Sequence, residues 1–351
     1  MVYQAGAIGV GGVGGSNAEA YLQTDGIDLV AIADVDTNLL AEKGDAWDIP
    51  EGHRYTSHEE MLSSEPLDAV VISTPTVFHR QHVLDAVELA DPAVIWSEKP
   101  IAESVTDAAE MVDTCKEHNT ELLIDHTRRF ADKYQLFREA IQSDDLLGAV
   151  KSIHIEFGEE LLRNGTHLID LVVFLLGVRG ERVHGAYLTG DHGMSAKVDE
   201  QVASYDDGGG GGILTLENGA CVMIDHTLPR ELSTYSLSIA GTEGAFAVTH
   251  EPFDIGQTQY WQRDGRTHVE AELPTDLQEA WNRNASSRTW RENAVAHQVA
   301  IMDGEEENIA PGSEALHVLE ILVAMFVAEY TQSQVELPLE RPLRDVTITS
   351  W

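Results

Sequence analysis

Short apolar segments alternate with helical patterns through the first third of the chain. The apolar segments predict strands, and the stretches between them, with apolar residues three or four apart, predict helices. Such alternation builds a parallel sheet with helices on both faces. The predicted strands are Ala5–Gly9, Asp28–Ala33, Ala69–Ser73, Ala93–Ser97 and Glu121–Ile124, and the predicted helices include Asn17–Gln23, His79–Ala90 and Thr106–His118.

The period of the pattern changes after a further predicted helix near Lys133–Ser143. Apolar residues then recur at every second position, as in Ile153–Phe157. The dipeptides Asn218-Gly219 and Asp264-Gly265 lie between such segments and predict hairpins, the first of type I′. We expect a largely antiparallel sheet that packs one face on helices and leaves the other free to meet a second subunit.

The remaining segments complete the predicted organisation. Two long helices are expected at Gln278–Met302 and Ser313–Thr331, and the run Gly208–Gly212 is expected to form a flexible loop. The chain is therefore predicted to be an α/β protein. A parallel-sheet domain spans residues 1–126, and an α+β domain built on a large, mainly antiparallel open sheet spans residues 127–351.

A glycine-rich turn follows the first predicted strand. Its order of glycines is that of a dinucleotide-binding βαβ unit: a tight turn at the first, close approach to a pyrophosphate at the second, and close helix packing at the third. Asp34 lies 20 residues after Gly14, where a carboxylate can bind ribose hydroxyls. The candidate cofactor-binding residues of this turn are Gly9, Gly11, Gly12, Val13 and Gly14. A chance glycine turn is the alternative interpretation.

The charge of the chain is extreme. Lysine and arginine together number 22 against 60 acidic residues, a formal net charge of −38, and only six of the basic residues are lysines. Such self-repulsion destabilises a folded state unless salt screens it, and the Debye length falls to about 3 Å in molar salt. We expect a halophile-type protein; a merely acidic enzyme is the alternative.

The same charge indicates that the partners are neither nucleic acids nor anionic membranes, because both would repel it. Cys115 and Cys221 fall in different predicted domains, which suggests free thiols and a reducing compartment. Neither a signal segment nor a membrane-spanning stretch is evident. We expect a cytoplasmic protein, without a metal site.

Glu98-Lys99-Pro100 directly follows the apolar strand Ala93–Ser97, so its side chains are expected at the ligand-binding edge of the sheet. A lysine there can hold a substrate hydroxyl or exchange a proton. The alternative is a solvated lysine at a strand end. Lysine is scarce in this chain, which favours the functional interpretation.

His167 and Asp170 are three residues apart at the start of a predicted helix that ends at Gly177. This spacing places both on one helix face, where Asp170 can orient the imidazole. A histidine at a helix start, with an aspartate favoured by the helix dipole, explains the same spacing.

Together these motifs resemble the Gfo/Idh/MocA family of oxidoreductases, over nearly the whole chain. The matching pieces are Gly9–Gly14, Ala33-Asp34, Ser73-Thr74-Pro75 with His79, Glu98-Lys99-Pro100, Arg129-Phe130, Gly165-Thr166-His167 with Asp170, Asn218-Gly219-Ala220 and Gly241-Thr242-Glu243-Gly244. The resemblance implies a Rossmann domain, then an α/β domain whose open sheet often mediates oligomers, here a homodimer or homotetramer. It also implies oxidation of a hydroxyl on a sugar, inositol or sugar derivative.

The resemblance further implies that Lys99 and His167 are catalytic, with His167 accepting the proton and Asp170 beside it. Thr74, Pro75, His79, Glu98 and Lys99 become candidate cofactor-binding residues. Asp34 favours NAD over NADP, because its charge would repel a 2′-phosphate. Arg163, Asn164 and Arg129 are candidate substrate contacts.

One position departs from the family pattern. Members commonly carry an aspartate four residues before the histidine, whereas this chain has Arg163. A guanidinium there can clamp a carboxylate or phosphate of the substrate. Pairing with Glu159 or Glu160, or a place outside the pocket, is the alternative.

Three other functions share these motifs. A redox-neutral glycosidase would use bound NAD without releasing NADH. A sensor or regulator would bind NAD without turnover. A reductase acting on an imine, enone or pyrrole ring would need a proton donor in the same place.

Overall fold

The computed structural model describes residues 2–158, 160–189, 204–206, 209–226, 235–250, 257–283 and 286–349. The chain folds into two compact units. The first comprises Met1–Phe130 with Ala285–Leu316, and the second comprises Ala131–Asn284 with His317–Ser350.

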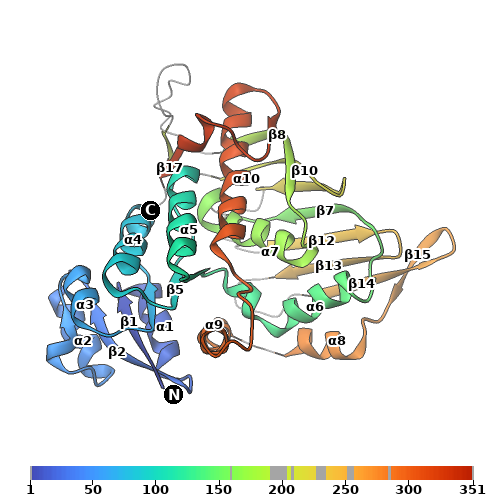
Figure 1. Ribbon diagram of the computed structural model, residues 1–351. Helices are drawn as coiled ribbons and strands as arrows, with labels where there is room; N and C mark the ends of the chain where they lie inside the picture. The colour runs from blue at the N-terminus through green and yellow to red at the C-terminus, as the bar shows by residue number, and fades with distance from the viewer. Residues whose placement is uncertain are drawn as a thin grey trace. The chain divides into compact units, whose positions relative to one another are not determined.

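The first unit contains a parallel six-stranded sheet in the order β3-β2-β1-β4-β5-β6. Strands β1, β2 and β5 of this sheet are labelled in Figure 1. Chain order reverses between β1 and β4, and this topological switch point is where doubly wound sheets bind ligands. The strands are β1 (Tyr3–Ile8), β2 (Ile27–Ala33), β3 (Arg54–Tyr55), β4 (Ala69–Ile72), β5 (Val94–Ser97) and β6 (Glu121–Ile124).

Two helices of this unit begin at a side-chain cap that the sequence supplies. Asp36 caps α2 by accepting hydrogen bonds from the backbone N–H groups of Asn38 and Leu39, and Ser104 caps α5 in the same way. The helices are α1 (Gly12–Tyr21), α2 (Thr37–Ala46), α3 (His58–Ser64), α4 (His79–Ala90), α5 (Val105–His118) and α9 (Ser287–Met302). Although α9 comes late in the chain, its Ala294 and Val295 belong to the core around β1 and β4.

The second unit contains a nine-stranded sheet in the order β15-β14-β13-β12-β7-β11-β10-β8-β16. The pairing of β7 with β11 is parallel and the other neighbours are antiparallel. Its strands are β7 (Val150–Glu156), β8 (Gly180–Thr189), β10 (Gly209–Leu216), β11 (Cys221–Asp225), β12 (Tyr235–Gly241), β13 (Gly244–His250), β14 (Gln257–Asp264), β15 (Thr267–Ala271) and β16 (Val335–Glu336). A separate parallel pair joins β9 (Ser204–Asp206) to β17 (Thr347–Thr349).

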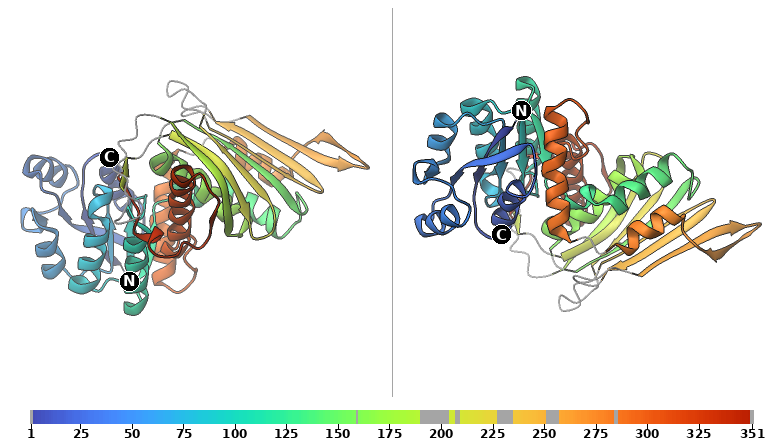
Figure 2. Two further views of the ribbon diagram at one scale, coloured as in Figure 1. Left: turned by 90° about the horizontal axis from the view of Figure 1, so that it is seen from above. Right: turned by 90° about the horizontal axis from the view of Figure 1, so that it is seen from below.

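One face of the large sheet packs on helices (Figure 2). Phe246 of β13 contacts Phe137 of α6 and Trp281 of α8. The opposite face carries polar residues such as His154 together with half-exposed Ile213 and Met223. The helices are α6 (Asp132–Gln142), α7 (Thr166–Leu176), α8 (Thr275–Asn282) and α10 (Gly312–Thr331), the last beginning in the first unit's range. The predicted fold class is confirmed.

The expected flexible loop at Gly208–Gly212 is wrong for the part that the structure describes. Gly209–Gly212 form the start of strand β10, and Gly208 lies outside the described residues. A Cβ on Gly211 would lie 2.3 Å from the carbonyl oxygen of Ile224, and one on Gly210 2.7 Å from that of Tyr187. The glycines therefore allow neighbouring strands to approach closely, which a prediction based on glycine's low strand propensity does not anticipate.

The single helix expected at Gln278–Met302 is also wrong, because the segment forms two helices. α8 ends at Asn282, and Arg283 adopts an extended conformation with ψ 123°. α9 starts at Ser287. Both predicted hairpins form, because β10 pairs with β11 and β14 pairs with β15. The expected type I′ turn at Asn218-Gly219 is wrong: Gly219 has a positive φ, but Asn218 is not among the described residues that have one, and type I′ needs it at both positions.

In the described parts of the chain, every helix is too short or too polar to cross a membrane.

Candidate cofactor-binding and catalytic site

The glycine-rich turn joins β1 to α1 at the switch point of the first sheet. Gly9 has φ 81°, and a Cβ there would lie 2.7 Å from the carbonyl oxygen of Ser73, at the end of β4. A Cβ on Gly14 would lie 2.2 Å from the carbonyl oxygen of Gly9. Side chains at either position would push the turn, the helix and the neighbouring strand apart.

The N-terminus of α1 is open to a ligand. Gly11 is its N-cap and supplies no side-chain hydrogen bond, and the first turn, residues 12–15, has no acidic residue. Backbone N–H groups at such a helix start carry partial positive charge and bind phosphate groups.

The carboxylate of Asp34 is held in place directly after β2. One oxygen accepts the backbone N–H of Val10 at 2.9 Å, and the other accepts the N–H of Asp36 at 3.0 Å. These two bonds fix the carboxylate beside the glycine turn, where its remaining lone pairs can accept ribose hydroxyls.

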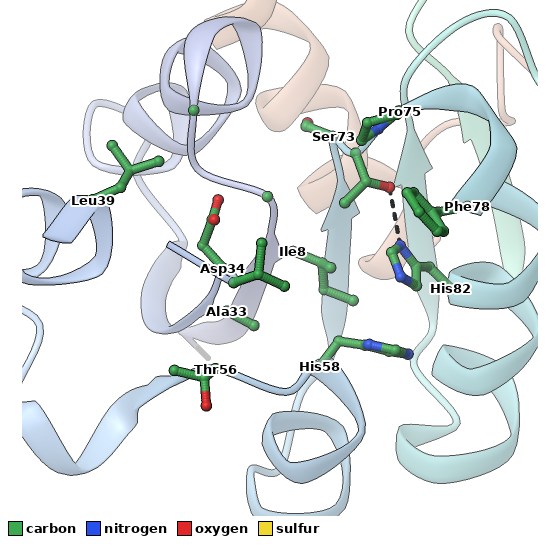
Figure 3. A pocket seen from close by; sticks show the side chains of 14 residues that line it. Ile8, Ala33, Asp34, Leu39, Thr56, His58, Ser73, Pro75, Phe78 and His82 are labelled. Carbon is green, nitrogen blue, oxygen red and sulfur yellow. Dashed lines mark hydrogen bonds between the residues drawn. The ribbon is translucent and has the colours of Figure 1, made fainter. Parts of the chain in front are cut away.

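A cavity of about 460 Å³ opens along this turn (Figure 3). Asp34 and Leu39 line one side, and Phe78, His82 and His58 line the other. The rings of Phe78 and His82 stack with their centroids 5.8 Å apart, and those of His58 and His82 lie 4.3 Å apart. The resulting wall is aromatic and is of the kind on which a purine base packs.

Two contacts hold this wall in place. Thr74 Oγ1 lies 3.0 Å from Nδ1 of His82, and His58 Nε2 lies 2.8 Å from a carboxylate oxygen of Asp85. Burial, together with the nearby His58 and His79, lowers the pKa of His82 to about 4. His82 is therefore neutral at physiological pH.

His79 ties two loops of the site together. Its Nε2 lies 2.8 Å from the carbonyl oxygen of Thr74, and its Nδ1 lies 2.9 Å from that of Pro100. The ring is fully buried, and this burial lowers the pKa of His79 although both carbonyl contacts oppose the shift. Its observed contacts join the loops after β4 and β5.

Lys99 lies in the loop after β5, as expected from the sequence. It is half-buried, and its backbone N–H donates to a carboxylate oxygen of Glu98 at 3.2 Å. Glu98 also accepts a hydrogen bond from the side-chain amide of Asn17 at 2.9 Å. The start of the lysine side chain is thus fixed to helix α1.

His167 and Asp170 lie in the second unit. A π-turn over Leu161–Gly165 leads directly into α7, and His167 is the second residue of that helix. His167 is half-buried and Asp170 is fully buried. The helix ends at Gly177, which has φ 62°.

The candidate substrate contacts have different surroundings. Arg163 is exposed in the π-turn, and Asn164 donates a hydrogen bond to Glu160 at 3.3 Å. Glu159, one of the expected partners of Arg163, lies outside the described residues. Arg129 is buried in the first unit, where its guanidinium bonds the carbonyl oxygen of Ile309 and the carboxylate of Glu314.

The arrangement fits a dinucleotide. The glycine turn leaves space that a Cβ would fill, the turn leads into the N-terminus of α1, and the Asp34 carboxylate lies beside the turn, where it can bind a ribose. Gly9, Gly11, Asp34, Thr74 and Pro75 all line the cavity.

Three of the polar residues beneath this site were not predicted from the sequence: Asn17, Asp125 and Arg291. Asp125 follows β6 just as Ser73 and Glu98 follow β4 and β5. Its position directly after a predicted strand could therefore have identified Asp125 as a candidate from the sequence. Arg291 comes from α9, and only the folded structure shows its contact with Asn17.

Two family models match this chain. The model described as "Oxidoreductase family, NAD-binding Rossmann fold" matches residues 3–126. The model described as "Oxidoreductase family, C-terminal alpha/beta domain" matches residues 151–337.

Similar proteins agree with these matches. A D-apiose dehydrogenase of Paraburkholderia graminis is 26% identical, over 99% of this chain and 93% of its own length. A D-glucoside 3-dehydrogenase of Escherichia coli is also 26% identical, over 92% of this chain and 93% of its own. The WlbA dehydrogenase of Bordetella pertussis, solved with NADH and UDP-GlcNAcA, has the same fold with a TM-score of 0.75 at 21% identity, covering 97% of this chain and 100% of that one.

Proposed function

We propose, since the chain belongs to the Gfo/Idh/MocA family of oxidoreductases, that it is an NAD-dependent dehydrogenase acting on a hydroxyl-bearing carbon of a sugar, inositol or sugar derivative. The observation that carries this proposal is the cavity along the glycine turn, with the fixed carboxylate of Asp34 on its edge. The names of the two full-length relatives, both dehydrogenases of sugars or glucosides, support the substrate class.

The bound nicotinamide would supply the hydride acceptor. In our proposal, His167 removes the proton of the substrate hydroxyl. Lys99 holds the same oxygen and stabilises the negative charge that develops on it. Asp170, buried three residues along α7, orients the imidazole.

Asp34 supports a preference for NAD over NADP. A 2′-phosphate on the ribose would meet this carboxylate, whose two oxygens are already held by Val10 and Asp36. The next residues along the chain, Val35 and Asp36, offer no positive charge in compensation, and the first lysine beyond is Lys43.

The net charge of −38 supports a protein that works in a salt-rich cytoplasm. The half-exposed Ile213 and Met223 on the large sheet support assembly through that face, as a homodimer or homotetramer. Sedimentation of the protein in molar KCl, before and after an Ile213→Asp change, measures whether that face forms an interface.

The proposed activity is tested with a panel of sugars, inositols and aldonic acids, assayed for NAD⁺ reduction at several molar KCl. Formation of NADH with at least one of them supports the proposal. The other functions give different results: hydrolysis without NADH for a redox-neutral glycosidase, NAD binding without turnover for a sensor, and oxidation of NADH by an imine or enone for a reductase.

A further inference from the structure

Asn17 of α1 lies at the centre of a buried set of hydrogen bonds beneath the Glu98-Lys99 loop. The residue has no exposed surface. Its amide nitrogen lies 2.9 Å from Glu98 Oε1, 3.2 Å from Ser73 Oγ and 3.3 Å from Asp125 Oδ2. One side chain of α1 thus contacts the residues that directly follow β4, β5 and β6.

Arg291 of α9 fixes which way round the amide of Asn17 lies. Its Nε donates a hydrogen bond to Asn17 Oδ1 at 2.8 Å. Because a guanidinium only donates, the atom of Asn17 that faces it is the oxygen, and the NH₂ group points toward Glu98. Arg291 therefore sets the direction of the hydrogen bond between Asn17 and Glu98: the asparagine donates and the carboxylate accepts.

The helix that carries Arg291 is itself part of the first unit. It lies in the segment Ala285–Leu316, which returns to this unit from the second. Ala294 and Val295 on the same helix belong to the core around β1 and β4. The Nη1 atom of Arg291 also donates to the carbonyl oxygen of Ser287, one turn earlier, at 3.3 Å. The guanidinium is thus anchored on a helix that the core holds in place.

Glu98 connects Asn17 to Lys99. While its Oε1 accepts the amide of Asn17, its Oε2 accepts the backbone N–H of Lys99 at 3.2 Å. The backbone N–H of Glu98 donates to the carbonyl oxygen of Ile72, at the end of β4, at 2.8 Å. Both the backbone and the carboxylate of Glu98 are therefore held. Hydrogen bonds of this kind behind a functional side chain determine where it starts.

We propose that Asn17, oriented by Arg291, is a positioning residue: through Glu98 it fixes the loop from which Lys99 reaches the substrate. The effect on turnover rests on the proposed dehydrogenase function. The series of hydrogen bonds from Arg291 through Asn17 and Glu98 to the N–H of Lys99 does not depend on that function. In this account α9, which comes late in the chain, helps to determine the position of a loop near residue 99.

The hydrogen bond between Asn17 and Glu98 can be exchanged end for end. Asn17→Asp keeps the shape of the side chain and an acceptor for Arg291, but it places a second carboxylate against Glu98. Glu98→Gln brings an NH₂ group against a donor, either Asn17 or the N–H of Lys99. With both changes, the glutamine NH₂ donates to the aspartate and its oxygen still accepts the N–H of Lys99.

The doubly changed protein also has the same net charge as the unchanged one, because one carboxylate is added and one is removed. Asp125 lies 3.3 Å from the atom of Asn17 that changes from donor to acceptor. We therefore expect the second change to restore activity in part and not completely.

The test measures kcat and KM of the two single variants and the double variant in molar KCl, with a substrate from the panel. Each single variant should lose about 10- to 100-fold in kcat, because the loop that carries Lys99 shifts. The double variant should be at least about 10-fold more active than the product of the two single losses predicts. Asn282→Asp is the matched control, since this exposed residue accepts a hydrogen bond from Gln278 that an aspartate keeps.

Hydrogen exchange of the Lys99 backbone amide tests the same contacts without a substrate. Exchange should be faster in Asn17→Asp and slower again in the double variant. Arg291→Ala should also speed this exchange, because the amide of Asn17 is then free to turn over. Arg288→Ala is its control, an exposed arginine on α9 that pairs with Glu292.

Losses of kcat that simply multiply in the double variant would overturn the positioning role. A lower melting temperature in Asn17→Asp with kcat unchanged would also overturn it, because Asn17 would then serve stability alone. Exchange of the Lys99 amide that is unchanged in both Asn17→Asp and Arg291→Ala would overturn the series of hydrogen bonds itself. Absence of turnover with every substrate in the unchanged protein would count against the dehydrogenase function alone, since the exchange measurement still decides on the hydrogen bonds.

Discussion

At the scale of single residues, Asp34 determines the preference for NAD over NADP in our account. Both of its oxygens accept hydrogen bonds from backbone N–H groups. Rotating the carboxylate away from a bulky ligand would break these hydrogen bonds. Hydrogen bonds to a charged group contribute about 1.5–3 kcal/mol each.

Asp34→Ser should therefore weaken NAD binding by about 10- to 100-fold, and it should narrow the gap between NAD and NADP because the repelling charge is gone. Titration of both cofactors by fluorescence measures these affinities. Asp28→Ser, an exposed change at the other end of β2, is the matched control. If Asp34→Ser kept the same ratio of affinities for NAD and NADP, another group would determine the preference between the two cofactors.

Residues differ in how far the sequence alone reveals them. The glycines of the turn, Asp34 and Glu98-Lys99 could be predicted because each stands at a fixed distance from a strand end. Asn17 and Arg291 could not, because their contact joins residues 274 positions apart and no local pattern encodes it. The roles of Lys99, His167 and Asp170 stay predictions.

At the scale of elements, Gly14 determines how closely α1 packs against the first strand. A Cβ at this position would overlap the carbonyl oxygen of Gly9, at 2.2 Å. Gly14→Ala should destabilise the protein by about 1–3 kcal/mol, and it should weaken NAD binding because the turn moves.

Thermal melting and NAD titration of Gly14→Ala measure these effects. Gly52→Ala is the control, because a Cβ on Gly52 meets nothing within 4 Å. Similar behaviour of the two variants would contradict the close packing of α1.

The alternation of strands and helices made the first sheet predictable, and β6 and α4 have the predicted bounds. Prediction failed where tertiary contacts outweigh local preference. Gly209–Gly212 pair with β8 and β11 as part of a strand. The two neighbouring strands approach so closely that they leave no space for side chains, which explains why glycine occupies these positions. The break at Arg283 separates α8 from α9, two helices that belong to different compact units.

At the scale of the whole molecule, the net charge of −38 should make stability depend on salt. Repulsion among the acidic side chains falls as the Debye length shrinks, so the melting temperature should rise steeply with KCl and level off at molar concentrations. Calorimetry over a range of KCl concentrations measures this. A melting temperature that is equal in dilute buffer and in molar KCl would contradict the halophilic interpretation.

Catalysis in our account needs both units, because Lys99 belongs to the first and His167 to the second. Removing His167 should leave cofactor binding to the first unit while removing proton transfer, and removing Lys99 should remove charge stabilisation. General acid–base catalysis contributes about 10²- to 10⁴-fold to a rate.

The most direct measurement is kcat for NAD⁺ reduction by His167→Ala and Lys99→Ala, with the substrate that the panel identifies and in molar KCl. His118→Ala, an exposed change at the end of α5, serves as the control. We predict that kcat falls by about 10²- to 10⁴-fold in both variants, with the Kd for NAD nearly unchanged in His167→Ala. Turnover within a few-fold of the unchanged protein in both variants would contradict the account.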